Sequence, residues 1–147
     1  MSEQVVELNT DWRPEPGSPM PVLVQTEDRA TLVFDKRESS TRVVVTFHGC
    51  LATQFGYPND EALAGHPLHR LGLRPYGVFE VNDSSWIERL SRQNRVVFPS
   101  GSINRLRHFV ITFHDSTFEC LASRYERREL DESAAAEILR ELHGDSA

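Results

Sequence analysis

Prolines dominate the start of the chain, before any regular alternation of hydrophobic and polar positions begins. The segment from Trp12 to Pro21 contains four prolines. Each proline fixes φ and lacks an amide hydrogen, which excludes a helix and disfavours a central strand. We therefore expect residues 1–20 to form an N-terminal arm that is either flexible or lies over the domain with Trp12 as its anchor. Residues 21–147 are expected to form a single domain.

Three strand-like runs follow the arm. The apolar runs 22–24 and 30–34 flank a polar turn at residues 27–29, which is the pattern of a β-hairpin. The run 42–48 is rich in β-branched residues and predicts a third strand. Together these segments predict an antiparallel meander.

The middle of the chain has fewer strand-like runs and more loop-forming residues. Residues 55–75 are rich in Gly and Pro and predict a long loop, and residues 76–81 predict another strand. Residues 83–94 predict a helix, because Ser85 and Glu88 have the spacing of a capping box and an apolar stripe follows.

The clearest element is a hairpin between Leu106 and Ser123. Closing it at Asp115 and Ser116 places alternate apolar residues opposite one another on one face. The polar Glu119 then lies on the other face, across from Thr112. The predicted pairs on the apolar face are Phe113–Phe118, Ile111–Cys120 and Phe109–Ala122.

The chain ends in a helix predicted for residues 131–143, which has acids at its start, an apolar stripe and Gly144 after it. Strands bunch together and do not alternate strictly with helices. We therefore expect an α+β fold with a mainly antiparallel sheet of about six strands, on which the C-terminal helix and one internal helix pack.

Composition narrows the possible partners. The 147 residues carry a formal net charge of −6, which argues against nucleic acid because phosphate binding needs a positive surface. Apolar runs such as Val43–Val45 fall far short of the ~20 residues that span a bilayer, so no membrane partner is expected. The start Met1–Gln4 lacks the features of a signal peptide, and we expect a cytoplasmic protein.

Cys50 and Cys120 have no zinc-binding spacing and are expected to be buried thiols. No metal site is predicted, and the sequence identifies no cofactor. It also contains no phosphate-binding glycine loop and no hydrolase motif.

One polar constellation carries possible chemistry. Thr46 and His48 belong to a Thr-Phe-His segment that is followed by Gly49. Thr112 and His114 occupy the same places in a second Thr-Phe-His segment, which is followed by Asp115. In both segments these residues alternate with core positions, so they point to the opposite face, as does Glu119. If the two strands are neighbours, these side chains form one polar patch. The two segments are either a diverged internal duplication or two core strands built from the same few β-forming residue types.

This patch gives the first hypothesis, a domain that binds or processes a small polar molecule. His48, His114 and Glu119 are the candidate catalytic residues, because an imidazole titrates near neutrality and a carboxylate orients it. Whether the site is catalytic is left open. The candidate binding residues are Thr46, Thr112, Arg74 and Tyr76, with residues 55–75 as a rim or lid.

The second hypothesis is a non-enzymatic protein-binding module, such as an inhibitor, an immunity-type protein or a regulator. An acidic surface can steer onto a basic partner. This hypothesis predicts an exposed patch containing Trp12, Tyr57, Asp60 and Glu61. Homodimerisation through an exposed sheet edge is a milder form of the same idea.

Overall fold

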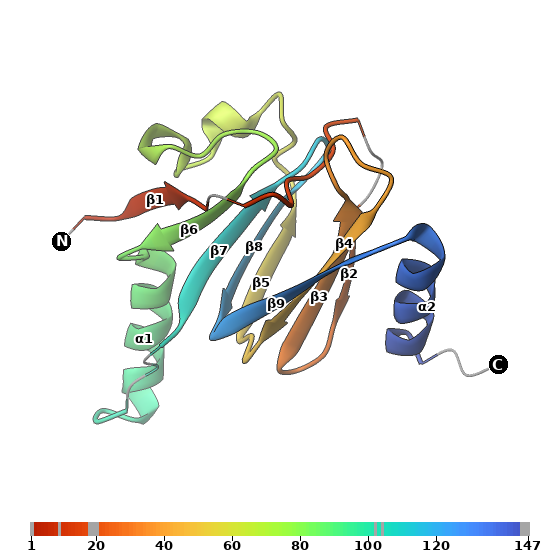
Figure 1. The fold of residues 1–147 in the computed structure, drawn as a ribbon. Coiled ribbons are helices and arrows are strands. Elements are labelled where there is room, and N and C mark those ends of the chain that lie inside the picture. Colours follow the sequence, from red (N-terminus) through yellow and green to blue (C-terminus); the bar gives the residue numbers. More distant parts are fainter. Residues whose placement is uncertain (1, 9, 18–20, 102, 104, 145–147) are drawn as a thin grey trace.

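The computed structural model describes residues 2–8, 10–17, 21–101, 103 and 105–144. Within these residues, nine strands form two antiparallel sheets that face each other, and two α-helices lie at opposite sides of the molecule (Figure 1). The antiparallel α+β composition agrees with the expectation, but the single sheet of about six strands is wrong. An apolar face on each strand fits one sheet covered by helices as well as two sheets covering each other, and only long-range pairing distinguishes them.

The strands divide by pairing, not by sequence order. The five-stranded sheet has the order β1 (Gln4–Glu7), β6 (Val78–Asn82), β7 (Arg107–Thr112), β8 (Thr117–Ala122) and β5 (Ala52–Gly56). The four-stranded sheet has the order β2 (Val22–Gln25), β3 (Arg29–Asp35), β4 (Arg42–His48) and β9 (Arg124–Leu130). The meander predicted for residues 22–48 is confirmed, since β2 pairs with β3 and β3 with β4.

The main core lies between the two sheets. Alternate residues of β4 and of the β7–β8 hairpin meet there, and Phe47 of one sheet packs on Phe118 of the other with ring centroids 5.4 Å apart. Trp12 is only 3% exposed and packs in the same core. The segment around Trp12 is therefore part of the packed domain. Cys50 and Cys120 are free thiols and both are buried.

The β7–β8 hairpin forms with a register two residues away from the one expected. Ile111, not Phe113, lies opposite Phe118, and Glu119 pairs with Val110 and not with Thr112. The turn is therefore longer than predicted and includes Phe113, whose amide donates to the carbonyl of Ser116. A shift of two residues keeps every side chain on its original face. The apolar and polar faces were consequently predicted correctly despite the wrong pairs.

Each helix begins at a side-chain cap. Ser84 caps α1 (Ser85–Val97) and accepts a hydrogen bond from the amide of Ile87, so the cap lies one residue before the predicted Ser85. Asp131 caps α2 (Glu132–Leu142). The apolar stripe of α2 packs on the outer face of the four-stranded sheet, where Ala135 contacts buried valines. No helix among the described residues is long and apolar enough to cross a membrane.

The Gly/Pro-rich segment covers the outer face of the five-stranded sheet. It contains two short 3₁₀ turns, η1 (Leu63–Gly65) and η2 (His69–Leu71), seen above β1 and β6 in Figure 1. Its apolar side chains form a second core on β6 and β7. The members of this second core are Leu63, Leu68, Leu73, Phe79, Val81 and Val110. Between this cover and α1 the sheet face is only partly filled.

Candidate functional site

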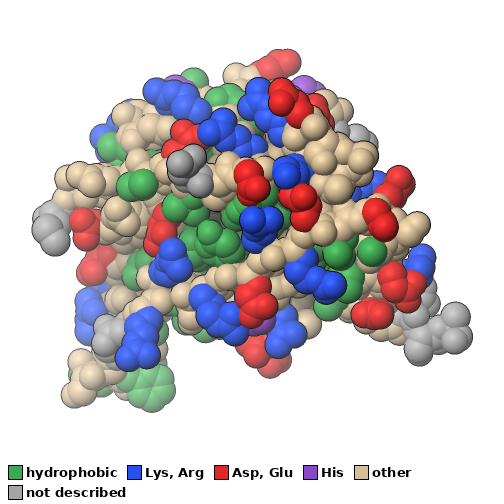
Figure 2. Space-filling view, viewed as in Figure 1, with side chains coloured by type: hydrophobic (Ala, Val, Ile, Leu, Met, Phe, Trp, Pro, Cys, Tyr) green, Lys and Arg blue, Asp and Glu red, His purple; other side chains and the backbone are tan. Residues whose placement is uncertain are grey.

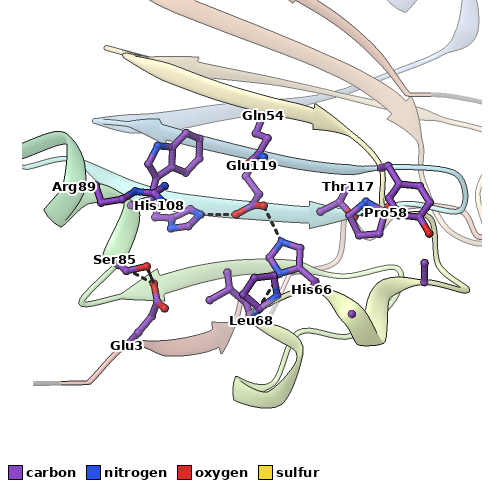
Figure 3. A pocket seen from close by; sticks show the side chains of 15 residues that line it. Glu3, Gln54, Pro58, His66, Leu68, Ser85, Arg89, His108, Thr117 and Glu119 are labelled. Atoms are coloured by element: carbon purple, nitrogen blue, oxygen red, sulfur yellow. Dashed lines mark hydrogen bonds and ion pairs between the residues drawn. The ribbon is translucent and has the colours of Figure 1, made fainter. Parts of the chain in front are cut away.

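A cavity of about 620 Å³ opens on the outer face of the five-stranded sheet. Strands β5, β7 and β8 form its floor, the Gly/Pro-rich segment forms one wall and the first turn of α1 forms another (Figure 3). The cavity is of the size that typically holds a small molecule. The lining residues that the argument uses are Gln54, His66, Trp86, Arg89, His108 and Glu119.

Glu119 lies at the centre of the floor, between two histidines (Figure 3). Its Oε1 is 2.8 Å from Nε2 of His108, and its Oε2 is 2.8 Å from Nε2 of His66. His108 is on β7 and is a diagonal cross-strand neighbour of Glu119 on β8, because Val110 pairs with Glu119. His66 directly follows η1. The carboxylate therefore joins two strands to the segment that covers them.

The remaining ring nitrogens are also engaged. The amide of Leu68 donates to Nδ1 of His66 at 3.0 Å, so Nε2 of this ring carries the hydrogen that Glu119 accepts. Nδ1 of His108 is 2.7 Å from the hydroxyl oxygen of Ser84. Since that oxygen already accepts from a helix amide, its hydrogen is free to point at His108. A continuous chain of hydrogen bonds thus runs from the cap of α1 to Leu68.

Glu119 is held in its ionised form. Burial opposes ionisation, but hydrogen bonds from His108 and His66, together with the coulombic attraction of these two residues, outweigh it and lower the pKa of Glu119 to about 2. The floor of the cavity therefore carries an ionised carboxylate. This charge is fixed in position before any ligand arrives.

The walls of the cavity are more apolar, with charges at the rim. The Trp86 indole meets the His108 ring edge-on, with centroids 5.3 Å apart. Arg89 lies one helical turn beyond Ser85 and lines the cavity as an exposed side chain. The carboxylate of Glu3 accepts hydrogen bonds from the amide and the hydroxyl of Ser85, at 2.7 and 3.0 Å. The rim therefore combines one cation with a carboxylate that is already bound.

The structure does not bring the predicted polar patch together. Thr46 and His48 are on β4 of the four-stranded sheet, whereas Thr112 and Glu119 belong to the other sheet. Both strands point their alternate apolar residues into the shared core, so their polar residues lie on opposite outer faces of the sandwich. His48 contacts Glu126 on β9, with Nε2 3.2 Å from Oε1.

His114 and Tyr76 form a separate surface cluster around Asp60. His114 Nδ1 is 2.8 Å from Asp60 Oδ2, and the Tyr76 hydroxyl donates to the same oxygen. These hydrogen bonds raise the pKa of Tyr76 to about 12 and raise the pKa of His114, while the bond from Tyr76 is the main cause that lowers the pKa of Asp60. None of the three side chains lines the cavity.

Thr112 and Arg74 have local roles in holding the covering segment. The Thr112 hydroxyl donates to the carbonyl of Arg74 at 2.7 Å and accepts from the amide of Gly77 at 3.0 Å. The Arg74 guanidinium donates to the carbonyls of His69 and Leu73. Of the seven predicted site residues, only Glu119 lines the cavity. Trp12, which was expected in the exposed patch of a protein-binding module, is only 3% exposed and cannot belong to such a patch.

His66 and His108 were both missed as site residues. The sequence did contain a signal for His108. It lies two residues before Val110 on the same strand, so it points to the same face as Val110 and its cross-strand neighbour Glu119. No local signal marks His66, because Pro67 after it indicates only a loop. Among the described residues, no group of three or more His, Cys, Asp or Glu side chains is arranged to hold a metal ion.

Comparison of the chain with protein-family models, with curated proteins and with solved structures finds no match.

Proposed function

We propose that this protein binds a small polar molecule in the cavity above Glu119. One observation carries the proposal: an ionised carboxylate, held between two imidazoles, forms the floor of a cavity of about 620 Å³. A buried charge is costly unless it is paired, and this one is paired with donors from two different parts of the fold. Such a preorganised charge offers a ligand donor a fixed partner.

The arrangement favours binding over proton abstraction. A carboxylate with a pKa of about 2 accepts a proton poorly near neutral pH. The four ring nitrogens of His66 and His108 are all engaged with Glu119, Ser84 or the backbone of Leu68. A catalytic role would require a ligand to replace one of these contacts, whereas a binding role requires no rearrangement.

The proposal is tested by filling the cavity. Gln54 lies on the edge strand β5, is exposed and lines the cavity, so Gln54→Trp should occupy part of it. Gln93 is an exposed residue of α1 outside the cavity, and Gln93→Trp is the matched control. A library of small polar compounds is screened by ligand-observed NMR against both variants and the native protein.

We expect compounds that bind the native protein and the Gln93→Trp variant, but bind the Gln54→Trp variant at least about tenfold more weakly. If every compound that binds does so equally to all three proteins, the cavity is not the binding site and the proposal fails. It also fails if no compound binds the native protein at all.

A second candidate function is protein binding through the free end of α1. Val96, Val97 and Phe98 are 81%, 70% and 60% exposed. Figure 2 shows hydrophobic side chains next to basic ones at this end of the molecule. Arg92 and Arg95 on the same helix are exposed as well. Exposed apolar residues that adjoin one another are typical of interfaces.

The occupant inferred for this surface is a second copy of the chain, whose own exposed Val96, Val97 and Phe98 would meet the same residues across a two-fold axis. Sedimentation analysis would then give a dimer. Val97→Asp should abolish it, and Val6→Asp, at a 43% exposed position of β1, should not. A native protein that stays monomeric at high concentration contradicts this candidate.

A further inference from the structure

We propose that the ligand of the cavity is a small zwitterion with an apolar body, of the amino-acid or short-peptide class, whose ammonium group faces Glu119 and whose carboxylate faces Arg89. This inference rests on the proposed function and specifies its ligand. It follows from the signs of the charges in the cavity and from what already occupies each of them.

The negative end of the site is Glu119. Its side chain is 10% exposed, and each oxygen accepts one hydrogen bond from a histidine. A carboxylate oxygen has room for a second donor, so an ammonium group can bind without displacing His66 or His108. Charge-assisted hydrogen bonds of this kind are among the strongest a pocket can offer. A ligand carboxylate would be repelled from the same place.

The positive end of the site is Arg89. The other rim charge, Glu3, is engaged by the amide and hydroxyl of Ser85. Arg89 makes no ion pair with any residue that the structure describes, although it lines the same cavity. By contrast, Arg92 and Arg95 on the same helix both approach Glu88. A guanidinium without a protein partner is suited to a ligand carboxylate, which it can bind through two parallel hydrogen bonds.

Apolar side chains surround these two charges. Trp86, Leu68 and Pro58 line the cavity together with the charged residues. Figure 3 labels Leu68 and Pro58 in this wall. Trp86 is held by its edge-on contact with His108, so its position is set by the same network that fixes Glu119. Burial of a hydrocarbon or aromatic body against these walls supplies affinity, and the two charges supply orientation. An amino acid with a large apolar side chain combines all three features.

Three probes that share one phenyl body test this ligand class: phenylalanine carries both charges, 2-phenylethylamine only the cation and 3-phenylpropionate only the anion. Their affinities are measured by titration calorimetry at neutral pH. We expect phenylalanine to bind at least about tenfold more tightly than 2-phenylethylamine, and 3-phenylpropionate to bind most weakly.

Arg89→Gln should reduce the affinity for phenylalanine to that for 2-phenylethylamine and leave the amine itself unchanged. Arg92→Gln is the matched control, because Arg92 is exposed on the same helix but does not line the cavity. It should change none of the three affinities. Equal effects of the two arginine variants, or 3-phenylpropionate binding as tightly as phenylalanine, would overturn the inference.

The experiment separates the ligand class from the cavity itself. If none of the three probes binds, but other compounds bind in a way that Gln54→Trp weakens, the zwitterion is wrong and the cavity remains the binding site. If phenylalanine binds the Gln54→Trp variant as well as the native protein, it binds outside the cavity and the inferred ligand class is wrong. The cavity proposal fails as well if no other compound distinguishes the two proteins.

Discussion

His108 and Glu119 contact each other across neighbouring strands, with Nε2 of the imidazole 2.8 Å from Oε1 of the carboxylate. The imidazole also reaches the cap of α1 through Ser84, and the carboxylate also reaches the covering segment through His66. One pair of side chains therefore links the sheet to both walls of the cavity. The same contacts that shape the cavity contribute to the stability of the fold.

Glu119→Gln is expected to destabilise the protein. The amide would carry no charge, and one of the two histidines would face its NH₂ group, so a donor would meet a donor. Breaking this buried pair should cost about 3 kcal/mol of unfolding free energy at neutral pH. Urea unfolding followed by circular dichroism measures the change.

Glu126→Gln is the control for that measurement. Glu126 has a 62% exposed side chain that pairs with Arg124 and His48, and solvent screens surface contacts of this kind, so Glu126→Gln should lower the stability far less. Equal losses in the two variants would show that the His66–Glu119–His108 contacts add nothing beyond a surface pair.

The contribution of Glu119 should depend on pH. Its pKa in the folded protein is about 2, below its ordinary value of 4.5, so the folded state favours the ionised form. The stabilisation is fully present above pH 4.5 and is lost as the pH falls toward 2. The difference in unfolding free energy between native protein and Glu119→Gln should therefore shrink as the pH falls from about 4.5 toward 2. A difference that stays constant from pH 4.5 down to the lowest pH at which the native protein is still folded contradicts the lowered pKa of Glu119.

Asp60→Asn is expected to change the titration of Tyr76. The hydrogen bond to Asp60 is the main cause that raises the pKa of Tyr76 to about 12. Removing the carboxylate charge should move this pKa back toward 10, its ordinary value. Ultraviolet difference titration of Asp60→Asn against Asp60→Asn/Tyr76→Phe isolates this group, and the native protein against Tyr76→Phe gives the reference. Identical titrations in the two pairs would contradict the contact.

Ser84→Ala should be more destabilising than the same change at Ser85. The Ser84 hydroxyl accepts from the amide of Ile87 and contacts Nδ1 of His108, and it is buried. Loss of the helix cap typically costs about 1 kcal/mol, and an unsatisfied buried nitrogen adds about 1 kcal/mol or more. Thermal unfolding of Ser84→Ala and Ser85→Ala compares the two. A larger loss for Ser85→Ala would identify Ser85 as the residue that matters for the start of α1.

Local patterns identified many elements but not all of them. The hydrophobic runs of β3 and β4 and the caps and stripes of the helices lie within short stretches of chain, so they can be read without knowing the fold. Strand β9 was missed because Arg124–Leu130 is mostly charged and exposed. It forms a strand because its backbone pairs with the whole length of β4. Pairing with a distant neighbour leaves no trace in local hydrophobicity.

The order of residues in the β7–β8 hairpin is enough to assign each side chain to a face, because side chains alternate along any strand whatever its partner. It placed Glu119 on the face opposite the core for this reason. Strand pairing in the folded protein, by contrast, puts β4 and β7 in different sheets, and this separates His48 from Glu119. The fold also brought His66 onto Glu119 across a separation of 53 residues. Contacts of that kind depend on how distant segments pack, and spacing along the chain does not encode them.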